Sequence, residues 1–228
     1  MIAMRYLLIP ALFATASGAT AAVFSATDAT GGAIPDGSSS GLARSLSINT
    51  GGQPIVSVSV DVNISATGGG GTAFLGDLYI YLTNGTDLAV LANRAGRRTG
   101  APAGYSDNQS MNVTFSASVG GDFHNYRVPV TGSHATALSG PLTGIWEADG
   151  RLVDPGTVLD SSPRTAGLGV FAGDIFDGTW NLFAADLSTG ATHQLNSWTL
   201  TVTTIPEPGT AALAALALAG LARRRRTA

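Results

Sequence analysis

The chain has 228 residues, a length that a single all-β domain can fill. Only 12% of the residues are charged, 30 are glycine, and all twelve basic residues are arginine. Between Ala22 and Ile205, seven arginines stand against fourteen acidic residues, a net charge near −7. This balance argues against a nucleic-acid-binding protein, because phosphates would be repelled. The absence of cysteine excludes disulfides, thiolate metal sites and cysteine nucleophiles.

Residues 1–22 have the pattern of a secretory signal peptide. Arg5 gives a positive start, Tyr6 to Phe13 form a short apolar run, and Ala19-Thr20-Ala21 fits the small-x-small cleavage rule. We therefore predict export, with cleavage after Ala21 or Ala22. The alternative is a buried N-terminal helix.

The first strand signals come from alternating residues. Residues 23–49 form a lead-in, and the sequence leaves open whether it contains a first strand. Asn49 to Gly52 suit a turn. From residue 55 the chain alternates, which predicts a strand whose apolar face holds Val56, Val58, Val60, Val62 and Ile64. After a glycine loop at 68–71, Leu78–Leu82 alternates again, with Tyr79 and Tyr81 opposite the leucines. Asn84-Gly85 predicts a hairpin turn before Leu88–Leu91.

The second half predicts further strands around an irregular middle. The expected strands are Met111–Val119, Tyr126–Val130, Leu168–Phe171, Thr179–Leu187 and Leu195–Thr203. Pro129 would confine its strand to a sheet edge. Residues 131–165 are rich in glycine and proline, and we expect them to be largely irregular. Seven or eight short strands without a long amphipathic helix predict an all-β, antiparallel β-sandwich.

The C-terminus has three parts in a fixed order. Pro206-Glu207-Pro208 precedes an uninterrupted run of small and apolar residues, 209–222. Four arginines follow at once: Arg223, Arg224, Arg225 and Arg226. Fourteen helical residues rise about 21 Å, short of the roughly 30 Å hydrocarbon core. The arginines would stay cytoplasmic, so this segment suits a transient membrane association with the body outside.

This tail, residues 205–228, resembles the PEP-CTERM sorting signal of Gram-negative bacteria. The resemblance implies processing at or near the motif by an exosortase, an integral-membrane enzyme. It also implies export across the inner membrane to the cell surface or extracellular space, in a host that makes an exopolysaccharide or biofilm matrix. The alternative is an ordinary short membrane anchor.

Three segments of the body, residues 50–204, together resemble the P domain (P/Homo B) found after the catalytic domain of kexin-like and subtilisin-like proteases. They are Gly76-Asp77-Leu78 with the strand after it, Gly178-Thr179-Trp180, and Ser197-Trp198. The resemblance implies a jelly-roll-like β-sandwich of about eight strands. Residues 94–165 depart from the family pattern. We expect Trp180 and Trp198 to lie on adjacent strands at the centre of the core, since buried indoles contribute strongly to packing.

No catalytic constellation is evident in the sequence. His124, His134 and His193 lie in polar, glycine-rich surroundings, and none belongs to a nucleophile-elbow or zinc-binding motif. We expect all three to be solvated loop side chains. The two glutamates, Glu147 and Glu207, give no paired-carboxylate site. A P domain without an attached protease has no triad to contribute, so we expect no enzymatic activity.

Calcium is the one cofactor the sequence suggests. Asp77 and Asp186 fall at signature positions of the resemblance, and Asp107 lies in a turn that could approach them. Calcium takes six to eight oxygen ligands, so spacing alone leaves open the alternative that these aspartates cap turns. Asp174 and Asp177 belong to the same class.

Three functions remain open from the sequence. The first is a structural or adhesive module at the cell surface or in the polysaccharide matrix. The second is an accessory domain that stabilises or targets a separate subtilisin-like protease. The third is a calcium-dependent carbohydrate-binding module, in which Trp146 would stack on a sugar rather than plug a loop onto the sandwich.

Overall fold

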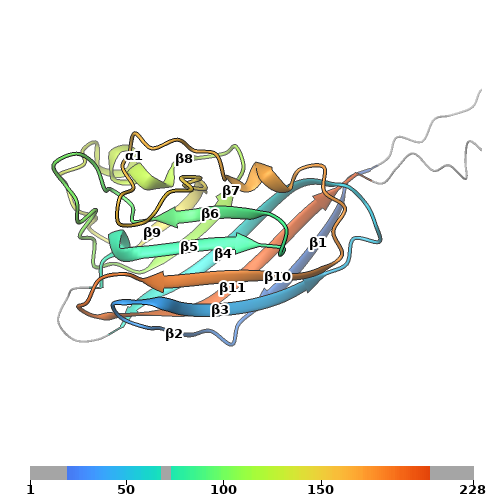
Figure 1. Ribbon diagram of the computed structural model, residues 1–228, viewed down its shortest axis with the longest axis horizontal. Coiled ribbons are helices and arrows are strands. Elements are labelled where there is room, and N and C mark those ends of the chain that lie inside the picture. The colour runs from blue at the N-terminus through green and yellow to red at the C-terminus, as the bar shows by residue number, and fades with distance from the viewer. Residues whose placement is uncertain (1–19, 68–72, 206–228) are drawn as a thin grey trace, which may run out of the picture. The chain divides into compact units, whose positions relative to one another are not determined.

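Two β-sheets lie one over the other in the computed structural model, which describes residues 20–67 and 73–205 (Figure 1). The larger sheet has the order β1-β11-β4-β7-β9-β8, with β2 paired to β11. Its strands are β1 (Ala22–Asp28), β2 (Gly32–Ile34), β4 (Ile55–Thr67), β7 (Met111–Ser116), β8 (Gly121–Asp122), β9 (Leu142–Glu147) and β11 (Thr192–Thr204). The smaller sheet has the order β3-β10-β5-β6. Its strands are β3 (Ser38–Ile48), β5 (Leu78–Thr83), β6 (Leu88–Asn93) and β10 (Gly178–Asp186).

The strand order is that of a jelly roll. Without the two- and three-residue strands β8 and β2 and the parallel strand β9, eight strands remain. Counted along the chain, they lie in the orders 1-8-3-6 and 2-7-4-5. Every pairing among these eight is antiparallel, whereas β9 runs parallel to both β7 and β8. The predicted β-sandwich is therefore confirmed, with a parallel extension at one edge of the larger sheet.

Helices are few and short in the described part of the chain. They are α1 (Arg127–Thr131) and the 3-10 turns η1 (Leu75–Asp77), η2 (Phe123–Asn125) and η3 (Leu168–Phe171). None of the helices in residues 20–67 and 73–205 is long and apolar enough to cross a membrane. The expected hydrophobic segment 209–222 lies outside the described residues, as do residues 1–19 of the predicted signal 1–22 and the glycine loop at 68–71.

Alternation along the strands builds the core between the sheets. Trp180 and Trp198 are 0% and 1% exposed, and both belong to one apolar cluster. The expectation that they sit on adjacent strands is wrong, because β10 and β11 belong to different sheets. The chain crosses from one layer to the other between them, so the two indoles fill the core from opposite sides.

The strand β4 contains a bulge that the sequence pattern did not reveal. Thr203 pairs with Ser57 and Thr204 with Ile55, so Val56 is an extra residue on β4. Such a residue reverses the alternation locally. Ile55 is buried and Val56 is 45% exposed, which corrects the expectation that Val56 faces the core with Val58.

Three local predictions in the second half are corrected by the structure. Residues 127–131 form α1 rather than a strand. Pro129 is tolerated because it lies in the first turn, where backbone N–H groups have no acceptor within the helix. Gly132, with φ of 82°, ends this helix. Leu168–Phe171 is a 3-10 turn, and the stretch expected to be irregular contains β9.

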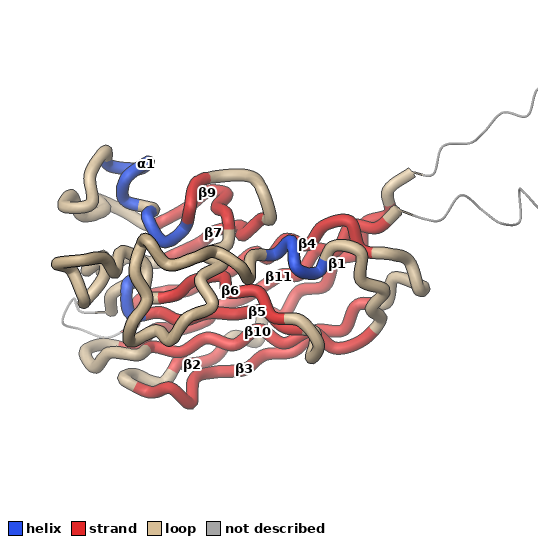
Figure 2. Tube along the Cα trace, turned by 45° about the horizontal axis from the view of Figure 1, so that its top comes forward, coloured by secondary structure: helices blue, strands red, loops and turns tan. Residues whose placement is uncertain are grey.

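The lead-in, residues 23–49, holds β2, β3 and nearly all of β1. β1 pairs with β11, with Ala22 opposite Thr204, and β3 pairs with β10. The first and last strands of the body are thus neighbours, and both chain ends leave from one end of the sandwich (Figure 1). Much of the loop structure gathers at the opposite end, together with α1 (Figure 2).

Replacing Trp180 tests the contribution of the core. Its ring packs against Phe171 and Phe176, with centroids 4.8 and 5.4 Å away. We expect Trp180→Ala to lower the free energy of unfolding of the full chain by about 3–5 kcal/mol, as measured by chemical denaturation. Thr179→Ala, on the exposed face of the same strand, should change it by less than about 0.5 kcal/mol. Equal losses in the two variants would contradict this assignment of the core.

Candidate functional site

Asp77 and Asp186 come together at one end of the four-stranded sheet, but each has its own cationic or imidazole partner. Asp77 lies 3.3 Å from Arg94, and the Nδ1 of His193 lies 2.7 Å from Asp186. Burial raises the pKa of Asp77, Arg94 acts in the opposite direction, and the nearby Asp186 raises it further. These carboxylates are thus engaged in protein contacts within a crowded, largely buried cluster.

Asp107 is engaged at a different place. Its Oδ2 accepts hydrogen bonds of 2.7 Å from both the Tyr126 hydroxyl and the Arg127 Nε, and its Oδ1 accepts one of 2.7 Å from the Leu138 N–H. Asp77, Asp107 and Asp186 therefore do not share a ligand sphere. Within residues 20–67 and 73–205, no group of three or more histidine or acidic side chains could hold a metal ion. These donors do not fit the expected calcium ion.

The histidines are not the solvated loop residues that the sequence suggested. His124 and His193 have no exposed surface, and His134 is partly buried. The ring nitrogens of His124 face two oxygen acceptors, 2.9 Å from Asp149 and 2.9 Å from the Arg97 carbonyl. Both ring nitrogens are therefore engaged by acceptors inside the body. A fully buried ring held at both nitrogens is a packing and hydrogen-bonding partner rather than an accessible general base.

His124 belongs to a charge network that joins the loops near the parallel edge of the larger sheet. Arg151 bridges Asp149 and Asp122 at 3.1 and 2.7 Å. Arg164 lies 3.0 Å from Glu147. Two arginines, three carboxylates and His124 thus form one network. The sequence pattern gave no sign of it because its members are spread over residues 122–164.

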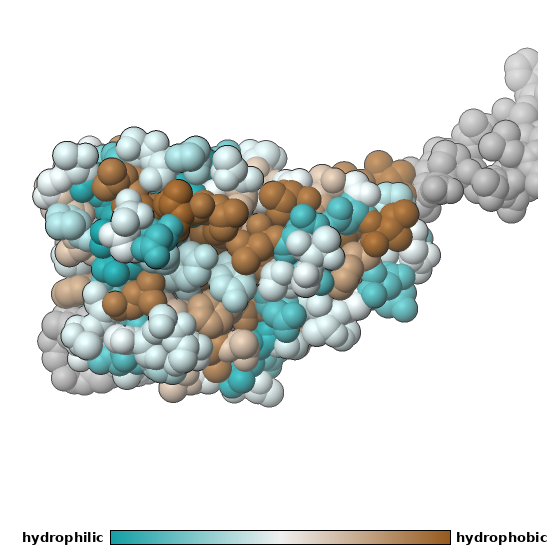
Figure 3. Space-filling view, viewed as in Figure 1, coloured by the Kyte–Doolittle hydropathy of each residue, from teal (hydrophilic) through white to brown (hydrophobic). Residues whose placement is uncertain are grey.

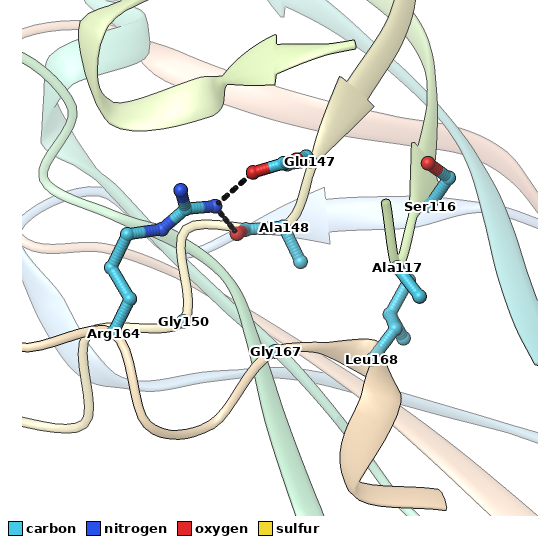
Figure 4. A pocket seen from close by; sticks show the side chains of 8 residues that line it. All are labelled: Ser116, Ala117, Glu147, Ala148, Gly150, Arg164, Gly167 and Leu168. Atoms are coloured by element: carbon cyan, nitrogen blue, oxygen red, sulfur yellow. Dashed lines mark hydrogen bonds and ion pairs between the residues drawn. The ribbon is translucent and has the colours of Figure 1, made fainter. Parts of the chain in front are cut away.

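A hollow of about 230 Å³ lies beside this network (Figure 4). Arg164 crosses one side of it, where its guanidinium also donates to the Ala148 carbonyl at 2.8 Å. Ser116 lines the hollow, and its hydroxyl donates to the Val119 carbonyl at 2.8 Å. The polar groups around this hollow are therefore already bonded within the protein, and no nucleophile–base pair faces it among the residues that line it.

Other residues singled out in the sequence also have structural contacts. Trp146 lies on β9, not outside a strand; it is 6% exposed, packs edge-on to Phe123 and Tyr126, and donates to the Thr143 carbonyl at 3.0 Å. Its role is packing rather than sugar stacking. Asp177 accepts hydrogen bonds from Thr50 and Gly52, as a turn cap does.

The residues expected to direct sorting all lie outside the described part of the chain, which ends at residue 205. They are Pro206, Glu207, Pro208, Arg223, Arg224, Arg225 and Arg226.

Comparison with known proteins identifies the C-terminal segment. Residues 204–226 match the PEP-CTERM protein-sorting motif, which confirms the predicted sorting signal and indicates exosortase-dependent export. No curated protein matches the chain.

Among solved structures, a similar one is the crystal structure of the Aeromonas sobria serine protease (ASP) in complex with the chaperone ORF2. It shares 15% sequence identity and a TM-score of 0.45, and the match covers 82% of this chain. The match spans about a quarter, 27%, of that chain.

The pH dependence of stability tests the charge network. Burial alone would raise the pKa of Asp122, but its hydrogen bond to Arg151 and the charges of Arg151 and Arg164 outweigh burial and lower it. A lowered folded-state pKa contributes stability that is present above the unfolded value near 3.8 and is lost as pH falls through the folded value. We therefore expect Asp122→Asn to be less stable than the wild type at pH 7, with a gap that narrows below about pH 4.

Chemical denaturation of the full chain at several pH values between 7 and 3 measures this difference in the free energy of unfolding between Asp122→Asn and the wild type. Asp36→Asn, which removes an exposed loop carboxylate without an ion-pair partner among the described residues, is the control. A gap between Asp122→Asn and the wild type that stays constant across this range would contradict the contribution assigned to these ion pairs.

Proposed function

We propose that the body is a non-catalytic structural or adhesive module that acts at the cell surface or in the extracellular polysaccharide matrix. The observation that carries this proposal is the sorting motif at residues 204–226, whose first residue, Thr204, is the last residue of β11. A folded β-sandwich is thus joined directly to a signal for export. An exosortase is the partner that this signal requires.

The side-chain chemistry of the body supports a non-catalytic role. A hydrolase needs a nucleophile, an accessible base and an orienting group within reach of one another. His124 and His193 are buried against carboxylates, and His134 is hydrogen-bonded to the Tyr105 hydroxyl at 2.6 Å. The groups most suited to proton transfer are thus used to hold the fold.

The outer face of the seven-stranded sheet supports a role in contacts with an uncharged, hydrated matrix. Hydroxyl side chains form cross-strand pairs there, with Ser25 and Thr201 at 3.1 Å and Thr27 and Thr199 at 2.9 Å. Short hydroxyl side chains keep a broad sheet face hydrated without adding charge. Such a face suits a protein that is surrounded by polysaccharide.

Removing the sorting motif tests this function. In a bacterium that carries an exosortase, we expect the wild-type chain to be processed and to appear in the surface or matrix fraction. Replacing Pro206, Glu207 and Pro208 by alanine should leave an unprocessed chain in the membrane fraction, because the motif for processing is gone. Cell fractionation with immunoblotting measures both outcomes.

Pro35→Ala is the matched control, since it removes an exposed proline from the loop before β3. It should be sorted as the wild type is. A matrix whose cohesion and composition are unchanged when the gene is deleted would contradict the structural or adhesive role, even where sorting itself occurs as expected.

A further inference from the structure

The outward face of the four-stranded sheet carries a groove that no sequence motif indicated. We call it the aromatic groove; it has a volume of about 360 Å³. Its lining includes Tyr79, Phe183, Ala185, Leu187, Asp154 and Gly156. Figure 3 shows the side of the molecule seen in Figure 1, where hydrophobic and weakly polar residues meet over this sheet. The groove combines aromatic rings, an exposed backbone turn and few charges.

Strand register places the rings on this face. Tyr81 pairs with Phe183 and Tyr79 with Ala185 across β5 and β10. Their neighbours along the strands, among them Ile80 and Leu182, are buried in the core. Because successive side chains point to opposite faces, the aromatic rings must point outward, where all three are partly exposed.

The rings form a continuous row held by packing. Tyr81 and Phe183 stack with centroids 4.8 Å apart and planes at 19°, and Tyr79 lies 5.8 Å from Tyr81. Phe183 in turn lies against the backbone of Gly41, where an added Cβ would be 2.4 Å from the ring. A side chain at residue 41 would displace Phe183, so glycine at this position keeps the row in place.

The wall of the groove is also fixed. The turn at 154–156 is held by a 2.6 Å hydrogen bond from Arg97 to the Gly156 carbonyl, and Asn93 donates to the Val153 carbonyl at 3.0 Å. Asn93 ends β6, the neighbour of β5, so the sheet itself positions the wall. A rigid floor and wall are the features expected of a preformed binding site.

The polar groups at the groove suit a ligand rich in hydroxyls. Within residues 20–67 and 73–205, the hydroxyl of Tyr79 has no hydrogen-bond partner, nor has that of Tyr81 beside the groove. Ser39 and Asp154 add further polar groups to the lining. Burial is the largest of the causes that raise the pKa of Tyr79, and the nearby Tyr81 and Asp149 raise it further. The Tyr79 hydroxyl therefore stays neutral and can donate or accept a hydrogen bond.

Charge selects among hydroxyl-rich ligands. Asp154 is the one charged side chain among the residues that line the groove, and the body carries a net charge near −7. An acidic polysaccharide would be repelled, as would a nucleic acid. Pyranose rings without charge offer C–H faces that pack on aromatic rings and hydroxyls that bond to tyrosine, serine and carboxylate groups.

We propose that the aromatic groove binds uncharged polysaccharide chains through Tyr79 and Phe183, with Tyr81 extending the same row of rings beside the groove. This inference rests on the proposed function, for which it supplies the ligand and the binding surface. The groove lies near the β10–β11 turn, whereas the sorting motif starts at the far end of the 13-residue β11, about 40 Å away at about 3.3 Å per residue. The groove therefore lies toward the opposite end of the sandwich from Thr204, where the sorting motif begins.

Affinity electrophoresis of the full chain in gels containing hydroxyethylcellulose, dextran or alginate tests the proposal. The wild type should be retarded by at least one of the two neutral polymers and not by alginate. Tyr79→Ala/Phe183→Ala should weaken retardation at least tenfold, while Ile145→Ala, which removes an exposed apolar side chain from β9, should not. A chelator should have no effect, because the rings rather than a metal make the contact.

Loss of folding is separated from loss of binding by two further measurements. Tyr79→Phe keeps the ring and removes only the hydroxyl, so it should fold normally and show an intermediate affinity. Thermal unfolding of each variant identifies any that are merely destabilised. Retardation by neither neutral polymer, retardation by alginate alone, or equal retardation of wild type and double variant would overturn the proposal.

The failure of this proposal differs from failure of the proposed function. If the chain is sorted to the surface and its deletion alters the matrix, but no neutral polymer retards it, only the groove assignment is wrong. If the chain is retarded by a neutral polymer but its deletion leaves the matrix unchanged, the structural role is wrong instead.

Discussion

The loop-rich half of the body folds around Asp149, a carboxylate with no exposed surface. It accepts hydrogen bonds from the Asn93 N–H at 3.1 Å, from His124 at 2.9 Å and from Arg151 at 3.1 Å. Its own N–H donates to the Leu91 carbonyl at 3.0 Å. Leaving such a charge buried without partners would cost about 3–5 kcal/mol, so β6, η2 and the chain after β9 must order together.

This constraint connects the fold to the proposed binding surface. The chain after Asp149 pairs with the edge of the smaller sheet, through hydrogen bonds from Gly150 to Val90 at 2.9 Å and from Val90 to Ala166 at 2.8 Å. An unpaired sheet edge would otherwise be open to association with other chains. The same segment then forms the turn at 154–156 that walls the aromatic groove. The buried Asp149–Arg151 ion pair thus helps to position the wall of the aromatic groove, which itself contains few charges. The chain has no cysteine, so this wall is held without disulfides.

The sequence predicted those features that depend only on residues close together in the chain. Alternation identified β5 with its outward Tyr79 and Tyr81, and the sorting motif was evident from its three consecutive parts. The bulge at Val56 was missed because it depends on the partner strand β11. The contacts of Asp149 were missed because they join residues far apart in the chain, as with Asn93, 56 positions away. Two tyrosines on the solvent face of a strand were the signal for the groove, but Phe183 and the wall become their neighbours only through the sheet order.

Hydrogen–deuterium exchange of Asp149→Asn against the wild-type full chain tests most directly whether Asp149 organises this half of the body. We predict a selective loss of amide protection in β6 and in residues 148–168, including Val90 and Ala166, because the neutral amide loses its ion pair with Arg151 and one acceptor oxygen of this buried cluster. The β4–β11 ladder should keep its protection, since its hydrogen bonds do not involve this network. Unchanged protection in residues 148–168, or an equal loss across both sheets, would contradict the central role assigned to Asp149.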